Sequence, residues 1–479
     1  MSKILFVGAE VMPFAATGGL GDVMGSLPAA MRAADKNCDV RVVMPLYSMV
    51  KEDWRGKMKT EAIFEVHLAW RTLRCGVKSL VKDNVTYYFI DNDYYFNRDG
   101  LYGHYDDGER YAYFCMAVME LMAQLDFYPD VLHAHDWQSA LSVVYLNCLY
   151  RNKPGYDKIK TVFTIHNIEY QGKYDFSILG DIFALGNDCH SLMDYDGCIN
   201  LMKGAIECAD IVSTVSPRYA EEIRQSQYAH GLEHIINKNA NKLRGILNGI
   251  DYVYYDPATD TAIEKNYCAD CVTVKAANKL ALQKKLGLPE RENVPMLAII
   301  SRLATHKGLD IVSEMAYGLL QYNDVQFVVL GKGEAKYEEF FCELERNFPT
   351  KARALIEYDR DLSKRIYAAS DIFVMPSASE PCGLSQMIAS RYGSIPVVRE
   401  TGGLYDSIKG YWEKDGELLG NGFTFSNYSA AELHDRICAA VELWHDGDKR
   451  QRFVQKIMNV DFSWNVSARR YLEMYDSIL

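Results

Sequence analysis

The sequence contains two successive series of short apolar runs, and this repetition constrains the fold more than any other feature. The first series includes KILFVGAE, DVRVVMPL, VTYYFID, DVLHAHD, KTVFTIHN and DIVSTVS, and the second includes MLAIISRL, VQFVVLG, KARALIEY, DIFVMPS and SIPVVRE. Continuous β-branched runs of this kind are typical of parallel strands buried on both faces, and the segments between them have helical spacing. We therefore expect an α/β protein with two doubly wound, Rossmann-like domains that face each other across a cleft.

The position of the second series predicts the domain boundaries. The segment GILNGID, at 245–251, separates the two series. We expect an N-terminal Rossmann-like domain over 1–245 and a C-terminal Rossmann-like domain over 246–458. The last segment, 459–479, has the pattern of an amphipathic helix, and we expect it to pack back on the first domain.

Composition excludes several classes of function. The chain has 479 residues, of which 49% are hydrophobic and 24% charged, as in ordinary globular proteins. Its formal net charge of −12 disfavours binding to nucleic acid or to an anionic membrane. No apolar run approaches the roughly 20 residues that a membrane-spanning helix needs, and the N-terminus lacks the pattern of a signal peptide. We therefore expect a cytoplasmic protein.

The twelve cysteines are scattered along the chain, which agrees with a reducing compartment. The segment CADC, from Cys268 to Cys271, holds the one close pair. Such a pair suits a metal or redox site, or two thiols near a surface turn with no special role. Without a second pair or a histidine partner in the sequence pattern, we favour the turn.

Two similar glycine-rich turns, TGGLGD and TGGLYD, each follow an apolar strand and precede a helical segment. Successive glycines let backbone amides approach an anion, and the helix that follows adds its positive end. A tight turn without a ligand is the alternative, but two copies at equivalent strand ends favour a shared ligand. Neither turn fits G-x-G-x-x-G or the P-loop. The candidate residues are Thr17, Gly18, Gly19 and Asp22 in the first turn and Thr401, Gly402 and Gly403 in the second.

Cations and a carboxylate follow two strands of the second series. In SRLATHKGLD, Arg302 comes just after a strand and Lys307 five residues later, a combination that suits a diphosphate. In MPSASEPCGLSQ, Glu380 lies between a strand and a helix, where a carboxylate beside free amides suits a polyol that carries a phosphate. A solvated loop and a simple interaction of Glu380 with the helix dipole are the alternatives. The amides belong to Cys382, Gly383 and Leu384.

Two strand ends of the first series carry further candidates. HAHDWQSAL and TIHNIEY place Asp136 and His166 at the same edge of the predicted sheet. His133 and His135 alternate along their strand, so we do not expect them to converge with Asp136 on a metal. The Asp91 to Asp93 segment, DND, fits a divalent cation that holds a nucleotide diphosphate, but the match is too short to be specific.

Together these motifs resemble the bacterial glycogen synthase and plant starch synthase family of retaining glycosyltransferases, whose two-lobed fold is of the GT-B type. The matching stretches are TGGLGDV, HAHDWQSAL, FTIHNIEYQG, TVSPRYAEEI, LNGID, SRLATHKGLD, PSASEPCGLSQ and TGGL, in family order over nearly the whole chain. The resemblance implies transfer of α-glucose from ADP-glucose, less often UDP-glucose, to the non-reducing 4-hydroxyl of an α-1,4-glucan. It implies no cofactor or metal beyond the sugar nucleotide, an acceptor-side N-terminal domain and a nucleotide-sugar C-terminal domain.

The resemblance also implies roles for single residues. Arg302 and Lys307 match the pair that stabilises the departing diphosphate, and Glu380 with the amides after it matches the group that holds the glucose hydroxyls. His166 matches a residue whose main-chain carbonyl lies near the reacting carbon. The remaining matches are Asp136 and Asn248 in the donor pocket, Tyr358 stacked on the base, and Tyr94 and Tyr95 as candidates for stacking on acceptor sugars.

The sequence departs from the family pattern at two positions. The family commonly has KTGGL at the first glycine turn, with its lysine on the donor phosphates, and Ala16 stands there in this chain. A missing charge-assisted bond costs about 1.5–3 kcal/mol, so donor preference is open. Ile388 occupies the place of a second glutamate seen in wider relatives. Three alternatives follow: use of UDP-glucose or another acceptor, a metal-dependent transferase using Asp91 and Asp93, or a weakened glucan-binding relative.

Overall fold

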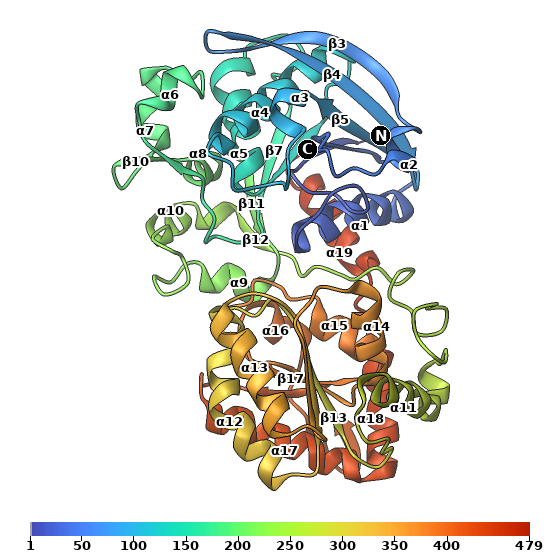
Figure 1. The fold of residues 1–479 in the computed structure, drawn as a ribbon. Helices are drawn as coiled ribbons and strands as arrows, with labels where there is room; N and C mark the ends of the chain where they lie inside the picture. Colours follow the sequence, from blue (N-terminus) through green and yellow to red (C-terminus); the bar gives the residue numbers. More distant parts are fainter. Residues whose placement is uncertain (1) are drawn as a thin grey trace. The chain divides into compact units, whose positions relative to one another are not determined.

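The computed structural model describes residues 2–479, which divide into two compact units (Figure 1). Of the described residues, unit 1 comprises 2–249 and 464–479, and unit 2 comprises 250–463. The chain therefore leaves unit 1 once and returns to it for its last helix. Both units are α/β with parallel sheets, so the predicted pair of doubly wound domains is confirmed.

Unit 1 is built on a nine-stranded sheet with the order β12-β11-β7-β6-β1-β2-β5-β4-β3. The seven strands from β12 to β5 are parallel to one another, whereas β4 runs antiparallel to both β5 and β3 at one edge of the sheet. The bounds are β1 (Lys3–Val7), β2 (Asp39–Pro45), β3 (Lys59–Leu68), β4 (Arg71–Lys82), β5 (Val85–Asp91), β6 (Val131–His135), β7 (Lys160–Ile165), β11 (Ile211–Thr214) and β12 (Leu243–Gly245). A small separate sheet contains β8 (Lys173–Tyr174), β9 (Asp194–Tyr195) and β10 (Cys198–Asn200).

Helices cover the sheet of unit 1 (Figure 1). The helices are α1 (Gly19–Ala34), α2 (Glu52–Arg55), α3 (Asp93–Phe96), α4 (Asp107–Gln124), α5 (Trp137–Tyr145), α6 (Ile178–Asp181), α7 (His190–Met193), α8 (Leu201–Cys208), α9 (Pro217–Glu222), α10 (Glu233–Lys238) and α19 (Trp464–Asp476). The last helix, α19, packs against α1, and its Tyr475 hydroxyl lies 2.7 Å from Nδ1 of His133 in the core. The C-terminal segment is therefore an integral part of unit 1.

Unit 2 is built on a six-stranded, fully parallel sheet with the order β15-β14-β13-β16-β17-β20. In chain order this is 3-2-1-4-5-6, the strand order of dinucleotide-binding folds. The bounds are β13 (Met296–Ile300), β14 (Gln326–Leu330), β15 (Ala352–Leu355), β16 (Ile372–Met375), β17 (Ile395–Arg399) and β20 (Phe423–Phe425). The four central strands β14, β13, β16 and β17 are almost entirely buried, which explains why their sequence runs are continuously apolar, whereas the edge strand β15 is mostly only partly buried.

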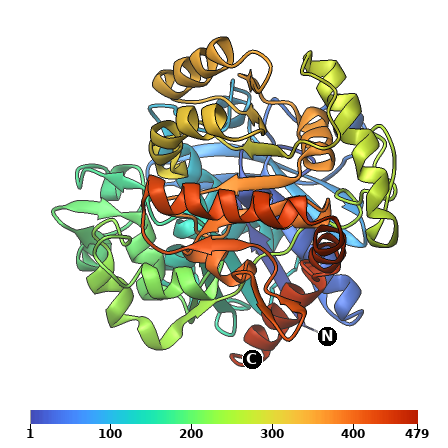
Figure 2. The same ribbon diagram turned by 90° about the horizontal axis from the view of Figure 1, so that it is seen from below.

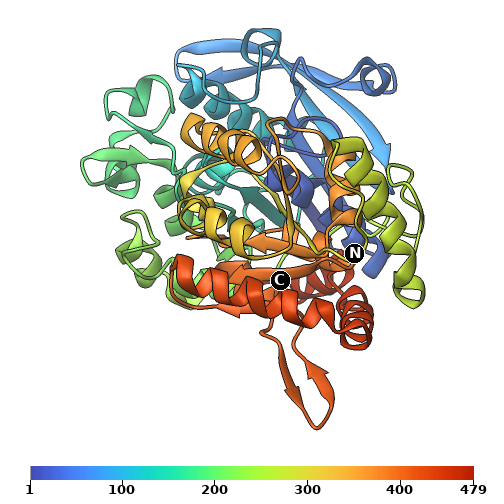
Figure 3. The ribbon, with the colours of Figure 1, turned by 60° about the horizontal axis from the view of Figure 1, so that its bottom comes forward.

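Eight α-helices, two short 3₁₀ helices and one hairpin complete the named elements of unit 2 within the described residues. The α-helices are α11 (Lys275–Leu286), α12 (Leu309–Tyr322), α13 (Ala335–Asn347), α14 (Arg360–Ala369), α15 (Ser385–Arg391), α16 (Gly402–Ser407), α17 (Ala430–His445) and α18 (Gly447–Met458), and the 3₁₀ helices span Ala269–Val274 and Thr305–Lys307. Helix α17 lies along the strands β16, β17 and β20 (Figure 2). The hairpin of β18 (Trp412–Lys414) and β19 (Glu417–Leu419) projects from the rest of unit 2 (Figure 3). Over residues 2–479, no helix combines the length and apolar character that crossing a membrane requires.

Candidate active site

Each sheet has one point where the strand order reverses direction, and the predicted residues gather there. In unit 2 the reversal lies between β13 and β16, and in unit 1 it lies between β1 and β6. Ligands of open α/β sheets bind beyond the carboxyl ends of the strands at such points. In unit 2 the segments that follow β13 and β16 carry Arg302, Lys307 and Glu380. In unit 1 the first glycine turn follows β1 and Asp136 follows β6.

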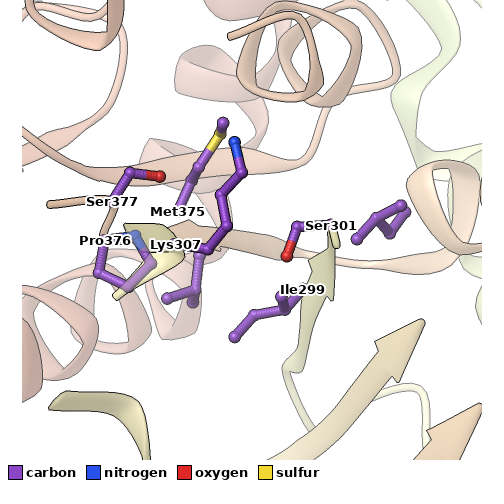
Figure 4. A pocket seen from close by; sticks show the side chains of 8 residues that line it. Ile299, Ser301, Lys307, Met375, Pro376 and Ser377 are labelled. Atoms are coloured by element: carbon purple, nitrogen blue, oxygen red, sulfur yellow. The ribbon is translucent and has the colours of Figure 1, made fainter. Parts of the chain in front are cut away.

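An ion pair joins the two candidate segments of unit 2. The Lys307 ammonium lies 2.6 Å from Oε2 of Glu380, and the Ser377 hydroxyl donates to the same oxygen over 3.0 Å. Glu380 is only 6% exposed, so its charge needs such partners. A small pocket beside this pair is lined by Lys307 and Ser377 together with Ile299, Ser301 and Met375 (Figure 4). The predicted cation, Lys307, and the predicted carboxylate, Glu380, are therefore the two members of one ion pair.

Arg302 differs from Lys307 because its charged group has no ion-pair partner within the described residues. Its side chain is exposed, and within residues 2–479 its guanidinium forms no hydrogen bond or ion pair. Its backbone carbonyl accepts hydrogen bonds from Ala304 and Ser301 at the end of β13, so the loop itself is held in place. A fixed loop that carries an unpaired guanidinium suits the binding of an anion.

The second glycine turn holds the Glu380 loop, and the prediction that it cradles an anion is wrong for Gly403. The Gly403 amide donates to the backbone carbonyls of Glu380 and Pro381, over 3.1 and 3.2 Å. A Cβ atom on Gly402 would lie 1.9 Å from the Glu380 carbonyl oxygen, so no other residue fits this close approach of two backbones. Thr401, at the N-terminus of α16, is fully buried. The second glycine turn therefore holds the backbone of the loop that carries the Glu380 carboxylate.

The backbone after Glu380 carries amides that remain available. The amides of Gly383 and Leu384, just before α15, hydrogen-bond to no other group of residues 2–479. Cys382, the third predicted amide, is buried. Tyr358, which precedes α14, is 80% exposed, and its hydroxyl accepts a hydrogen bond from Nε of Arg360. An exposed ring on a loop at this edge of the sheet is free to stack on a planar ligand.

The first glycine turn does hold an anion, but this anion is the side chain of Glu10. The amides of Thr17 and Gly18 donate to Oε2 of Glu10 over 2.5 and 3.0 Å, and the Thr17 hydroxyl donates to Oε1 over 2.8 Å. The Tyr102 hydroxyl adds a fourth hydrogen bond, over 2.7 Å. Glu10 is not among the site residues that the motifs predict. Its signal was a single acidic residue three positions after the end of an apolar strand.

The remaining residues of this turn lie at the start of α1. Gly19 is the first residue of the helix, and Asp22 stands in its first turn. Ala16, which replaces the family lysine, is partly buried, and a Cβ atom on Gly21 would lie 2.3 Å from the Ala16 Cβ atom. The small side chain of Ala16 therefore packs directly on the first turn of α1.

Asp136 and His166 are brought together at the ends of β6 and β7. Oδ1 of Asp136 accepts a hydrogen bond from the His166 amide over 2.7 Å. Burial raises the pKa of Asp136 to about 7, although backbone hydrogen bonds from His166 and Asn167 act in the opposite direction; the Glu10 carboxylate raises it further. Asp136 has a φ of 58°, a strained conformation for a residue other than glycine. In this conformation its carboxylate accepts the hydrogen bond from the His166 backbone.

A second histidine fixes the side chain of His166. Nδ1 of His135 lies 2.9 Å from Nε2 of His166, so one ring donates and the other accepts. Burial lowers the pKa of His166 to about 3 and holds the pKa of His135 well below its usual range, so both rings are neutral at pH 7. His133 is engaged elsewhere, with Tyr475 and with Thr164.

Asn248 lies near the end of unit 1 and is 6% exposed. Its Oδ1 atom is buried and has no hydrogen-bond partner among the described residues. An unsatisfied buried amide oxygen is costly unless a ligand or water pairs with it. Asn248 is therefore suited to receive a donor group of a substrate.

The predicted acceptor tyrosines differ, and the expectation for Tyr95 is wrong. Tyr94 is 68% exposed, whereas Tyr95 is fully buried and donates its hydroxyl to Oε1 of Glu109 over 2.5 Å. Only Tyr94 presents a ring for stacking on a sugar. In the nearby DND segment, Asp91 pairs with Lys78 over 3.1 Å. Across residues 2–479, no group of three His, Cys, Asp or Glu side chains is arranged to hold a metal ion.

Two known protein families match most of the chain. The family described as starch synthase catalytic domain matches residues 3–238, and the family described as glycosyl transferases group 1 matches residues 280–459. The first match lies within unit 1, and the second lies within unit 2. Each unit therefore corresponds to one family of glycosyltransferase domain.

Full-length relatives support the same relationship. The chain is 44% identical over 475 residues to a glycogen synthase of Bacillus licheniformis, covering 99% of this chain and 97% of that one. It is 43% identical over 478 residues to a glycogen synthase of Bacillus subtilis, covering 99% and 98%. Among solved structures, the catalytic domain of starch synthase IV from Arabidopsis thaliana, bound to ADP and acarbose, matches with a TM-score of 0.90 and 35% identity. That match covers 100% of this chain and 99% of the other.

Proposed function

Because the chain belongs to the starch and glycogen synthase family of glycosyltransferases, as its motifs predict, we propose that it uses ADP-glucose as donor and an α-1,4-glucan as acceptor. The glucosyl group passes to the 4-hydroxyl at the non-reducing end, and its α configuration is retained. The observation that carries this proposal is the Lys307–Glu380 ion pair at the switch point of a dinucleotide-type sheet, with the unpaired Arg302 in the same segment after β13 as Lys307. The related starch synthase IV structure holds ADP, which supports the choice of donor.

The diphosphate of the donor is assigned to Arg302 and Lys307. A nucleoside diphosphate is a good leaving group, so its departure depends on stabilising negative charge more than on a proton donor. The guanidinium of Arg302 forms two parallel hydrogen bonds to phosphate oxygens, and the Lys307 ammonium adds a point charge. The free amides of Gly383 and Leu384 supply further donors. Tyr358 stacks on the adenine ring.

The glucose hydroxyls are assigned to Glu380, whose carboxylate is already oriented by Lys307 and Ser377. In unit 1, Asp136 orients the backbone of His166, whose carbonyl faces the reacting carbon in this proposal. Oδ1 of Asn248, which has no partner among the described residues, accepts a hydrogen bond from the same sugar nucleotide. In this proposal Tyr94, whose ring is exposed, stacks on the acceptor glucan.

Retention follows from attack on the face that the diphosphate leaves. The acceptor hydroxyl forms the new bond to the anomeric carbon as the bond to the diphosphate breaks, and its proton passes to a phosphate oxygen. A covalent glycosyl-enzyme on Glu380 or Asp136 is the competing route. Mass spectrometry of the Glu380→Gln variant with donor distinguishes them. We expect no glycosyl adduct, and capture of one contradicts same-face attack.

The donor assignment is tested by incubating the protein with glycogen and either ADP-glucose or UDP-glucose, and measuring the nucleoside diphosphate released. We expect faster release of ADP than of UDP, with radiolabelled glucose recovered in α-1,4 linkage. Faster release of UDP contradicts the donor assignment. Binding of glycogen without release of either nucleotide identifies a glucan-binding protein instead. Activity that disappears in EDTA and returns with a divalent cation points to a metal-dependent transferase.

A further inference from the structure

The cysteine pair of the CADC segment lies outside the candidate site and has a geometry of its own. Cys268 and Cys271 begin the short 3₁₀ helix Ala269–Val274, which leads directly into α11 of unit 2. Cys268 is exposed to solvent and Cys271 is partly exposed. Their Sγ atoms lie 3.0 Å apart. The sequence alone favoured two unremarkable thiols, but at this separation the two sulfur atoms are in direct contact.

Backbone hydrogen bonds hold the two sulfur atoms in this arrangement. The Cys268 amide donates to Sγ of Cys271 over 3.0 Å, and Sγ of Cys268 accepts from the Cys271 amide. This reciprocal pattern is a capping box in which two thiols replace the usual oxygen side chains. Cys271 has φ −129° and ψ 41°, so the chain bends at this residue instead of continuing as a helix. A disulfide has an S–S distance of about 2.05 Å, so closing the bond requires a movement of about 1 Å.

The two thiols are chemically unequal. Hydrogen bonds from the Cys271 thiol and from the Asp270 amide lower the pKa of Cys268, whereas donating to Cys268 raises the pKa of Cys271. The thiolate is the nucleophile in thiol–disulfide exchange, so the exposed Cys268 is the attacking group and Cys271 the resolving one. By contrast, burial raises the pKa of Cys38 and of Cys75 to about 12, so these thiols stay protonated.

We propose that Cys268 and Cys271 form a reversible disulfide by exchange with low-molecular-weight disulfides. In the first step the Cys268 thiolate attacks one sulfur of the small disulfide, forms a mixed disulfide and releases one small thiolate. In the second step Cys271, as its thiolate, attacks Sγ of Cys268, forms the intrachain bond and releases the second small thiolate. The protein loses two protons and two electrons, and the small disulfide is reduced to two thiols. A dithiol reductant reverses both steps.

The sequence around the pair allows a direct test by mass spectrometry. Lysines at 265 and 275 bound one tryptic peptide, NYCADCVTVK, which contains both cysteines and no other. The full-length protein is incubated with oxidised glutathione, labelled with iodoacetamide and digested. We expect this peptide to be two hydrogen masses lighter and free of label, and to take two labels after treatment with dithiothreitol. Two labels without reduction, or a stable glutathione adduct on the unchanged chain, contradict the proposal.

Two serine variants test the order of the steps. Cys271→Ser removes the resolving thiol, so the glutathione adduct is expected to accumulate on Cys268. Cys268→Ser removes the attacking thiol, and we expect adduct formation at Cys271 to be roughly tenfold slower. Equal rates in the two variants contradict the assigned roles. These measurements record thiol state and not glucosyl transfer, so their outcome is independent of the proposed function. Circular dichroism of both variants checks that the fold is intact.

Discussion

The Lys307 ammonium lies 2.6 Å from Oε2 of Glu380. The two residues were assigned to different parts of the donor, the diphosphate and the glucose, yet in the structure each is the other's charged partner. Because Glu380 is nearly buried, removal of Lys307 leaves a carboxylate with one neutral donor, Ser377. The loss of one member therefore disturbs the position and charge of the other.

A double-mutant cycle measures this coupling. We expect Lys307→Met and Glu380→Gln each to lower kcat/KM for ADP-glucose by about a hundredfold, since a charge-assisted bond contributes about 1.5–3 kcal/mol. The double variant is expected to be little worse than either single variant, because the first change already breaks the pair. Steady-state release of ADP gives the three values. If the two losses multiply in the double variant, the residues act independently and the coupling is absent.

Restoring the family lysine at position 16 is expected to strengthen donor binding. In Ala16→Lys the new ammonium reaches either the donor phosphates or the Glu10 carboxylate, whose Oε2 lies 3.5 Å from the position of a Cβ atom on Gly21. Because one charge-assisted bond is gained, we expect about a tenfold lower KM for ADP-glucose. Ala16→Met is the matched control, since it adds a similar length without charge. An unchanged KM in the lysine variant contradicts a phosphate role for this position.

The raised pKa of Asp136 predicts a pH-dependent stability of unit 1. The folded-state pKa is about 7, above the usual value of about 3.9, so folding favours the protonated carboxyl. The contribution of Asp136 to the free energy of unfolding is complete below about pH 4. It is lost as the pH rises through 7, at no more than about 1.4 kcal/mol per pH unit. Asp136→Asn keeps an oxygen for the His166 amide but does not titrate.

Hydrogen exchange of peptides from β6 and β7, corrected for the intrinsic rate at each pH, checks this expectation. Relative to Asp136→Asn, the protein is expected to lose protection between pH 4 and pH 7.5. A constant difference between the two proteins over this range contradicts a raised pKa.

Two substitutions separate the hydrogen bond of His135 from its packing. In His135→Asn the side-chain amide of the asparagine lies near the position of Nδ1, so it keeps the hydrogen bond to His166. In His135→Gln the side-chain amide of the glutamine lies near the position of Nε2 instead. We expect kcat to fall about tenfold in the glutamine variant and only a few-fold in the asparagine variant, because one hydrogen bond contributes about 1 kcal/mol. The KM for glycogen is expected to stay unchanged in both. Equal losses in kcat indicate that His135 only fills space.

The sequence was sufficient to predict which residues lie at the strand ends. Arg302, Lys307 and Glu380 each follow a continuous apolar run, and parallel strands bring their carboxyl ends to one edge of a sheet. The β3–β4 hairpin was missed because its strands are only partly buried, and their pattern is correspondingly weak. Antiparallel edge strands of this kind lack the apolar runs that identify central ones.

The sequence could not predict which residues pair with these side chains, because the partners come from distant segments of the chain. Glu380 and Lys307 are 73 positions apart, and Glu10 and Tyr102 are 92 apart. Gly403 followed the pattern of an anion-binding turn, yet its amide is taken by a carbonyl of the neighbouring loop. Propensity and motif rules describe local chemistry, whereas these contacts depend on how the loops pack.

The return of the chain to unit 1 has a consequence for synthesis on the ribosome. Helix α19 packs on α1, and its Tyr475 bonds to His133, so the N-terminal half lacks a piece of its interior until the last residues emerge. Domains generally fold in the order in which they are made. In this protein all residues of unit 2 are synthesised before the last helix of unit 1. Unit 1, whose synthesis begins first, is therefore completed after unit 2.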